Sequence, residues 1–293
     1  MSFPDPIPIP KSGALERLTP LVRRLVAPNA SPLTSTGTCT YIVGAGDVVV
    51  VDPGPDDPIH FRNLLAATES ERVCAIFVTH SHRDHVGLVA KLKGTSDSEV
   101  LGAATPQGRE GGVDSGDERS YAPDRELSDG RSIKVAGLDM TVIATPGHAP
   151  NHLCFAFENE GTLFSGDHVM AWSTTIIAPP EGNMADYLAS LEKLRQRTET
   201  MYWPGHGGAV ADPQRYVGAL LKHRLQRESA IFARIKAGVD TLDAVAEAVY
   251  PGLDSKLRGA ARLSTLAHIE HLASKGEALV LGDLRDGGRV VVV

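Results

Sequence analysis

The sequence lacks the features that would place a chain in or across a membrane. No run of about 18 apolar residues occurs in it, so we expect no transmembrane helix and no membrane partner. The N-terminal segment MSFPDPIPIP has no basic start followed by an apolar core, which argues against a signal peptide. Cysteine is scarce as well: Cys39, Cys74 and Cys154 lie far apart within apolar runs. We therefore expect buried free thiols and a cytoplasmic location.

An excess of positive charge is also absent. The net charge is −7, from 29 basic and 36 acidic side chains. The distribution is uneven: residues 212–293 carry 12 basic and 10 acidic side chains, whereas the stretch from Gly94 to Gly130 carries 9 acids and 3 arginines. This balance argues against a strong electrostatic grip on nucleic acid, because phosphate binding depends on clustered cations.

Three parts of the chain differ in texture. Prolines at positions 4, 6, 8 and 10 predict an extended arm over residues 1–30. Residues 31–211 alternate strand-like and helical runs, including a helix over 58–68 and a fully apolar strand over 74–78. Within this part, Gly94–Gly130 is rich in glycine and poor in apolar residues, which predicts a long irregular excursion. Such an excursion is either a solvated surface loop or a flap beside the active site.

Residues 212–293 predict a separate helical unit. Helical patterns cover 212–237, 241–249 and 260–274, and apolar runs on either side of the turn at 285–288 predict a terminal hairpin. Helices followed by a hairpin are typical of a small winged-helix unit. The first helix carries five cations, which form either a solvated face or a basic stripe: Lys222, Arg224, Arg227, Arg234 and Lys236.

The most informative segment follows the apolar strand over 74–78. Four potential metal ligands lie there within six positions: His80, His82, Asp84 and His85. Imidazole and carboxylate together suit zinc and its neighbours in the first transition row. A lone histidine is usually structural, but four ligands packed this tightly predict a metal site.

Three further segments share one pattern, in which a strand is followed by a tight glycine turn and then a potential ligand. They are Thr145-Pro146-Gly147-His148, Phe164-Ser165-Gly166-Asp167 and Trp203-Pro204-Gly205-His206. Glycine gives the backbone the freedom to aim the next side chain. We therefore expect His148, Asp167 and His206 to meet the histidine-rich segment.

The order and the intervals of these ligands resemble those of the metallo-β-lactamase-fold hydrolases. The resemblance covers residues 31–210 and implies an α/β fold, a four-layer αβ/βα sandwich with the site along one edge. It also implies two divalent metal ions, with zinc favoured. It places His80, His82 and His148 in the first metal site, Asp84, His85 and His206 in the second, and Asp167 between them as a bridging ligand.

A narrower resemblance concerns two segments outside the ligands. Thr36–Gly44 resembles the opening of the lactamase-beta-like endoribonuclease subgroup, and Ser264–Gly276 resembles the last helix of its C-terminal winged-helix domain. The chain departs from the subgroup at two positions: Cys39 stands where the subgroup often has Asn, and Ala149 where it has Thr. The resemblance implies domains at 31–211 (catalytic) and 212–293 (winged helix).

The ligand set predicts a mechanism. Two divalent ions about 3.5–4 Å apart can hold a hydroxide between them as the nucleophile. Asp84 is the expected catalytic residue, which orients the hydroxide and passes a proton to the leaving group. Asp52 is expected to support a metal-binding imidazole. His152 and His168 either contact substrate or support a ligand, and Trp172 is a candidate for the pocket wall. Four histidines have no expected metal role: His60, His223, His268 and His271.

Three functions remain open at this level. The subgroup resemblance implies a dinuclear zinc hydrolase that cleaves single-stranded RNA endonucleolytically. The low positive charge favours an alternative within the same class, hydrolysis of small esters, thioesters or lactones. The third function is a nucleic-acid-binding winged-helix regulator with a vestigial metal site. Because the last predicted helix is poor in cations, we expect the C-terminal unit to serve in docking or dimerisation, which makes a homodimer a candidate assembly.

Overall fold

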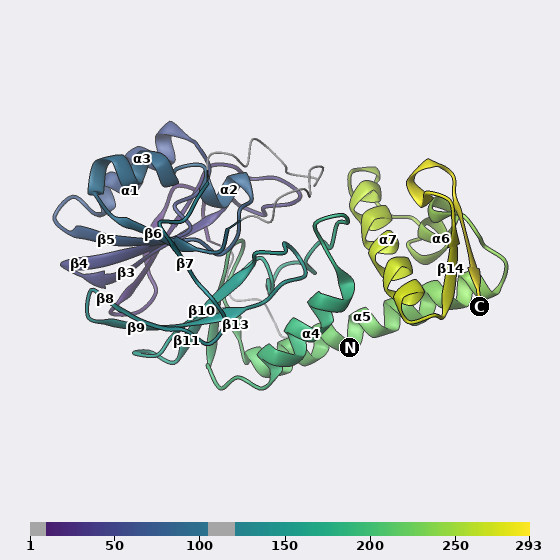
Figure 1. Ribbon diagram of the computed structural model, residues 1–293. Helices are drawn as coiled ribbons and strands as arrows, with labels where there is room; N and C mark the ends of the chain where they lie inside the picture. Colours follow the sequence, from purple (N-terminus) through teal and green to yellow (C-terminus); the bar gives the residue numbers. More distant parts are fainter. Residues whose placement is uncertain (1–9, 105–120) are drawn as a thin grey trace.

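Two β-sheets form the centre of the molecule. The computed structural model describes residues 10–104 and 121–293 (Figure 1). The strands of the first sheet follow one another in chain order; β1 to β4 are antiparallel, and β4 to β7 are parallel. Their bounds are β1 Leu15–Arg17, β2 Val22–Val26, β3 Cys39–Ala45, β4 Asp47–Val51, β5 Arg72–Phe77, β6 Glu99–Gly102 and β7 Arg125–Glu126.

The second sheet has the order β13-β12-β11-β10-β9-β8. Only β11 and β12 pair in parallel, so the loops after both strands leave the sheet at the same edge. Its strands are β8 Ser132–Val135, β9 Leu138–Ala144, β10 Leu153–Phe157, β11 Thr162–Gly166, β12 Met201–Pro204 and β13 Val210–Ala211.

The two sheets pack face to face over a core of large apolar side chains. Phe77 of β5 meets Phe155 of β10 edge-on, with ring centroids 5.1 Å apart. In β4, Val49 faces this inner core, whereas Val48 faces the helices on the outside. A strand buried on both faces must be apolar throughout, and this explains the unbroken valine run at 48–51.

Helices cover the outer face of each sheet. On the first sheet lie α1 (Pro58–Ala67), α2 (Arg83–Val86) and α3 (Val89–Ser96). On the second lie α4 (Met184–Arg195) and the first half of α5 (Pro213–Lys236), through residues such as Tyr216, Val217 and Leu220. The order helix, sheet, sheet, helix confirms the predicted αβ/βα sandwich.

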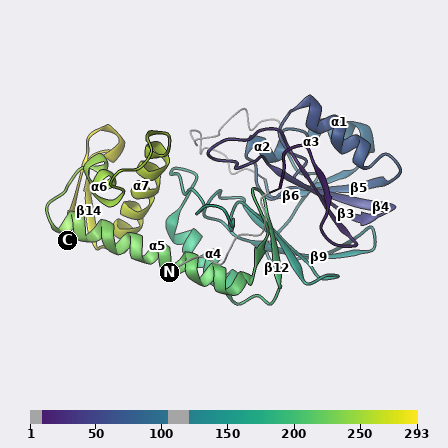
Figure 2. The same cartoon turned by 180° about the vertical axis from the view of Figure 1, so that it is seen from behind.

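A small C-terminal unit follows at the far end of α5. It comprises α6 (Leu242–Val249), α7 (Arg258–Ser274) and the antiparallel hairpin β14 (Ala278–Leu281) with β15 (Arg289–Val292). These elements pack around Ile231, Ile235, Leu266, Ile269 and Val290. Figures 1 and 2 show α5 running unbroken from beneath α4 into this unit. The winged-helix prediction is confirmed, and none of the described helices is long and apolar enough to cross a bilayer.

Two stretches differ from the predictions. Residues 15–26, inside the predicted arm, form β1 and β2, because Val22 and Val26 fill the core between the sheets. The irregular excursion predicted over Gly94–Gly130 is wrong in part, since Val100 and Leu101 are buried in β6 and anchor it beside β5. Residues 105–120, and with them the question of a flap, lie outside the described residues.

Candidate metal centre

The seven predicted ligands come together along one edge of the sandwich. His80 and His82 follow β5, and Asp84 and His85 lie in α2 directly after them. The loops after β9, β11 and β12 supply the remaining three. Tight glycine turns make this approach possible: a Cβ on Gly205 would lie 2.3 Å from Asp167 Oδ1, so only glycine fits there. The three ligands from these turns are His148, Asp167 and His206.

Three imidazoles form the first group. His82 Nδ1 lies 2.9 Å from His80 Nε2 and 3.0 Å from His148 Nε2. All three ring nitrogens fall within 4.8 Å of one another. Three nitrogens that converge on one point are the donor set of a first-row transition metal such as zinc.

The second group combines imidazole and carboxylate. His206 Nε2 lies 3.2 Å from Asp84 Oδ2 and 3.2 Å from Asp167 Oδ2, and His85 Nε2 lies 3.5 Å from Asp167 Oδ1. Asp167 Oδ2 is also 3.7 Å from His148 Nε2, which belongs to the first group. Asp167 therefore lies between the two groups.

A buried carboxylate fixes the tautomers of two imidazoles. The hydroxyl and the backbone N–H of Thr79 donate to Asp52, at 2.7 and 2.8 Å, and His85 Nδ1 donates to Asp52 Oδ2 at 2.8 Å. The hydroxyl of Thr79 has thus used its proton, so it accepts one from His80 Nδ1 at 3.0 Å. In their neutral forms, both histidines then present an unprotonated Nε2 to the cluster. This contact matches the supporting role expected for Asp52.

Backbone carbonyls orient two more imidazoles. His148 Nδ1 donates to the carbonyl of Ile176 at 2.8 Å, and His206 Nδ1 donates to that of Gly37 at 3.4 Å. The hydroxyl of Thr38 donates to Asp84 Oδ2 at 2.9 Å. Sequence reasoning missed these three partners, because a carbonyl can come from any residue and carries no signature in the sequence.

The electrostatics differ between the two groups. Burial lowers the pKa of His80 well below its usual value and that of His148 to about 4, so both rings are neutral ligands. In the second group, burial opposes charge, but the carboxylates of Asp167 and Asp84 outweigh it. They raise the pKa of His206 to about 9 and that of His85 well above its usual value. The second group therefore attracts positive charge.

The donor atoms fit divalent cations. His85 Nε2 and Asp167 Oδ1 are buried, and neither has a hydrogen-bond partner among the described residues. Among these residues, the only cationic partners of Asp52, Asp84 and Asp167 are histidines. Buried carboxylates without a fixed counter-charge are costly, and a bound cation offsets that cost.

His152 supports the cluster from behind. The backbone N–H of Asp167 donates to His152 Nε2 at 3.1 Å, and His152 Nδ1 lies 2.8 Å from the hydroxyl of Thr145. Of the two expected roles, support of a ligand is thus the one that the geometry shows. His168 is buried and packs on the ring of Tyr187, with ring centroids 4.6 Å apart. It does not line the cavity beside the metal groups.

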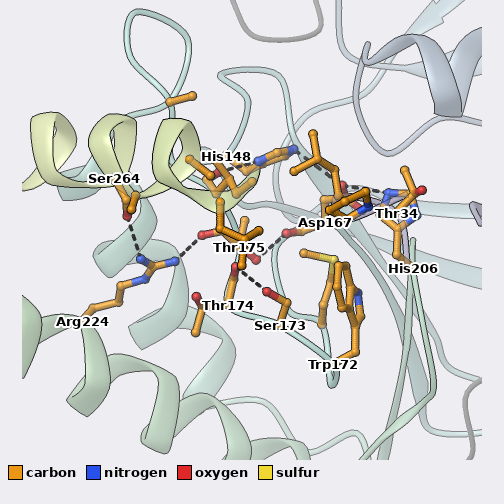
Figure 3. Close-up of a pocket in the computed structure, with 18 of the residues that line it drawn as sticks. Thr34, His148, Asp167, Trp172, Ser173, Thr174, Thr175, His206, Arg224 and Ser264 are labelled. Atoms are coloured by element: carbon orange, nitrogen blue, oxygen red, sulfur yellow. Dashed lines mark hydrogen bonds and ion pairs between the residues drawn. The ribbon is translucent and has the colours of Figure 1, made fainter. Parts of the chain in front are cut away.

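A cavity of about 380 Å³ opens beside both groups (Figure 3). His82, Asp84, His148, Asp167 and His206 lie at one end of it. Trp172 forms part of the wall, as predicted. The opposite wall comes from the C-terminal unit, through Tyr250, Leu253, Leu257, Ala260, Ala261 and Ser264.

Arg224 belongs neither to a solvated face nor to an exposed basic stripe, which corrects both alternatives for this residue. Its side chain is 3% exposed and donates to the carbonyl of Thr175 and to Ser264 Oγ (Figure 3). Thr175 in turn donates from Oγ1 to the carbonyl of Asp167 at 2.7 Å. On α5, Leu220 and Glu228 lie one turn to either side of Arg224 and are buried on the same face. This helical spacing is the sequence signal that indicates burial of Arg224. Three other cations of α5 are exposed: Lys222, Arg234 and Lys236.

Comparison with known families agrees with this geometry. Residues 34–206 match the Metallo-beta-lactamase superfamily, and residues 241–290 match the Beta-lactamase associated winged helix domain. The chain therefore belongs to the metallo-β-lactamase superfamily and is a hydrolase of that class, with candidate metal-binding groups of histidine and aspartate.

Individual relatives are similar over most of the chain. Beta-lactamase-like protein 2 homolog of Drosophila melanogaster is 30% identical over 279 residues, which is 91% of this chain and 92% of the relative. Atrochrysone carboxyl ACP thioesterase AacuM of Aspergillus aculeatus is 28% identical over 78% of this chain and 69% of its own. A Beta-lactamase domain protein from Burkholderia ambifaria shares the fold, with a TM-score of 0.82 at 21% identity, over 99% of this chain and 97% of its own.

Proposed function

We propose that this protein hydrolyses acyl thioesters or related small esters and lactones, with two divalent metal ions, zinc favoured. One observation carries the proposal: the candidate metal groups lie at one end of a cavity whose opposite wall is largely apolar and comes from the C-terminal unit. A pocket of this size and polarity suits a small substrate with an apolar segment. One relative, Atrochrysone carboxyl ACP thioesterase AacuM, is named as a thioesterase, which supports the same class.

The distances support an assignment of ligands. His80, His82 and His148 would hold the first ion, and Asp84, His85 and His206 the second. Asp167 would contact both, since its Oδ2 lies 3.2 Å from His206 and 3.7 Å from His148. The supporting hydrogen bonds leave each of these imidazoles except His82 with Nε2 facing the cluster.

The chemistry divides between the ions and the protein. Bound divalent ions supply Lewis acidity and make water a nucleophile near neutral pH. Asp84 lines the cavity, and its Oδ2 is held by Thr38 and His206. Its other oxygen, Oδ1, is the proposed site that accepts a proton from the attacking water and passes it to the departing thiol or alcohol. The apolar wall would exclude bulk water from the acyl segment.

Endonucleolytic cleavage of single-stranded RNA is the second candidate. It is favoured by the resemblance of Thr36–Gly44 to the endoribonuclease subgroup. The same ions can activate water against phosphorus as well as against a carbonyl carbon. The cavity's apolar wall and the chain's net charge of −7 argue for the acyl substrate instead.

The packing of α7 argues against the hypothesis of a nucleic-acid-binding regulator. In a winged-helix unit that reads DNA, a helix must be free to enter the major groove. Here α7 packs against α4 and lines the cavity with Ala260, Ala261 and Ser264. The face of α7 that carries Ala261, Ser264 and Thr265 is thus covered within the chain.

A substrate screen tests the proposal. The metal-loaded protein is incubated with acyl thioesters, aryl esters, lactones, a β-lactam and labelled single-stranded RNA, with Asp84→Asn as the matched control. We expect thioester turnover that Asp84→Asn abolishes. Cleavage of RNA without turnover of any acyl substrate would favour the second candidate and contradict the first.

A further inference from the structure

The end of the cavity away from the metal groups carries basic side chains. Three basic side chains on neighbouring turns of α5 line it: His223, Arg224 and Arg227. The carboxylates that line the cavity are Asp84, Asp167 and Glu181, all beside the metal groups. In Figure 3, Arg224 and Ser264 lie on one side of the pocket, and Asp167 and His206 on the other.

The two guanidinium groups have no carboxylate partner among the described residues. Arg224 bonds only to neutral acceptors, the carbonyl of Thr175 and the hydroxyl of Ser264, and its buried Nε has no hydrogen-bond partner there. Arg227 donates to the carbonyl of Val249 at 2.9 Å, and its guanidinium lies 4.2 Å from the centroid of the Tyr250 ring. A buried cation without a counter-charge is unfavourable unless a ligand supplies one.

The two arginines also affect the pKa of the neighbouring His223. The pKa of His223 lies below its usual value, first because the ring is partly buried and then because Arg224 and Arg227 repel a further positive charge. The groups that face His223 from other elements include His268 of α7, which acts in the same direction. The position of the basic side chains and the lowered pKa of His223 therefore both indicate an excess of positive charge at this end of the cavity.

We propose that this end of the cavity binds an anionic group of the substrate, a carboxylate or a phosphate. The inference rests on the proposed acyl hydrolase function and narrows its substrate class. The substrate is an acyl thioester or ester in which an apolar segment separates the bond to be cleaved from the anionic group. The apolar segment lies along Leu253, Leu257 and Ala260, and the anion lies at Arg227 and Arg224. Guanidinium groups suit either anion because their planar fork matches its oxygens.

Two sources of the anion must be separated. The carboxylate can belong to the acyl group, or the phosphate can belong to the thiol carrier. Three substrates distinguish them: the pentanoyl and glutaryl thioesters of N-acetylcysteamine, and the pentanoyl thioester of coenzyme A. Glutaryl differs from pentanoyl only in that a carboxylate replaces the terminal methyl group, and the phosphates of coenzyme A lie only on the thiol side.

Arg227 is the residue to vary, because Arg224 also holds Thr175. In the wild type we expect kcat/KM for one anionic substrate to exceed that for pentanoyl-N-acetylcysteamine by about tenfold or more. Arg227→Gln should bring this ratio close to one, and Arg227→Lys should retain part of it. Arg234→Gln removes an exposed cation from the same helix and should leave the ratio unchanged. Equal turnover of all three substrates, or an equal loss on all three in Arg227→Gln, would overturn the proposal.

A binding measurement keeps this test independent of turnover. Calorimetry on the metal-loaded full chain compares pentanoate with glutarate, and N-acetylcysteamine with coenzyme A. We expect the member that carries the additional anionic group, glutarate or coenzyme A, to bind about tenfold more tightly in at least one pair, and Arg227→Gln to remove the difference. Equal affinities within both pairs would refute the anion site. A clear preference without hydrolysis of any thioester would instead refute the proposed function alone.

Discussion

The two ends of the cavity are built in different ways. At the metal end, each imidazole except His82 is held by a hydrogen bond from the sandwich itself, as Asp52 holds His85 and Ile176 holds His148. At the other end, Tyr250 packs against the core of the C-terminal unit, whereas Leu257 is 37% exposed and lies outside that core. The metal end thus has the rigidity that bond cleavage requires, and the other end has the surface that selects a substrate.

The two ends are nevertheless connected. Arg224 of α5 donates to the carbonyl of Thr175, and Thr175 donates to the carbonyl of Asp167. The next carbonyl along the chain, that of Ile176, accepts from His148. Helix α5, whose Arg224 also bonds to Ser264 of α7, therefore helps to hold the loop that positions two proposed ligands.

The largest expected effect lies at the metal end. Asp84→Asn preserves the shape of the side chain but removes its charge and its capacity to transfer a proton. We expect the variant to fold normally and to lose at least about 100-fold in kcat on any substrate that the wild type hydrolyses. Steady-state kinetics and circular dichroism test this. If the variant retains activity within a factor of two, Asp84 has no catalytic role at the metal end of the cavity.

Removing the hydrogen bond between Arg224 and the carbonyl of Thr175 should have an intermediate effect on kcat. Arg224→Gln removes the guanidinium that fixes Thr175, so we expect kcat to fall about tenfold, as for other residues that orient metal ligands. The metal affinity, measured by competition with a chelator, should weaken in parallel. Lys222→Gln, an exposed cation on the same helix, serves as the control. If only KM changes in Arg224→Gln, the residue acts on the substrate alone.

The smallest effect on catalysis should come from Glu228, which lies within the C-terminal unit. Burial raises the pKa of its carboxyl, but His268, His271 and Lys275 outweigh burial and lower it to about 2 from an ordinary 4.5. A lowered pKa stabilises the folded state above the unfolded value, and this stabilisation is lost as pH falls toward 2.

Glu228→Gln should therefore lower the free energy of unfolding by about 1–2 kcal/mol at pH 7. The difference in the free energy of unfolding between variant and wild type should decrease between about pH 5 and pH 3. Urea titrations at each pH measure this difference. The kcat of the folded variant should be unchanged, since Glu228 does not line the cavity. A difference that stays constant with pH would show that the carboxylate's charge contributes nothing.

The family resemblance implied the sandwich, and residue types and spacing marked seven candidate ligands, which the structure brings together. Strands buried on both faces must be apolar, as at residues 48–51, and ligands must be histidine or aspartate in a fixed order. Close backbone approach requires glycine, as at Gly205, where a Cβ would meet Asp167. These constraints act on residue types, so they remain visible in the sequence.

The end of the cavity away from the metal groups could not be predicted in the same way. Leu257 and Ala260 line the cavity only because α7 packs across from the sandwich, and nothing in an alanine or a leucine marks that contact. Arg224 was placed on a solvated face or a basic stripe of the helix because its charge suggested exposure, and both alternatives are wrong for this residue. Its spacing from Leu220 and Glu228 already placed it on the buried face of α5.

Metal content tests the central claim most directly. The full chain is purified without chelator, its protein concentration is fixed by amino-acid analysis, and its metals are counted by elemental analysis before and after titration with zinc. The two convergent donor groups around Asp167 predict two equivalents of divalent metal per chain. A content near zero, with no uptake on titration, would contradict the metal centre and the hydrolytic function proposed for it.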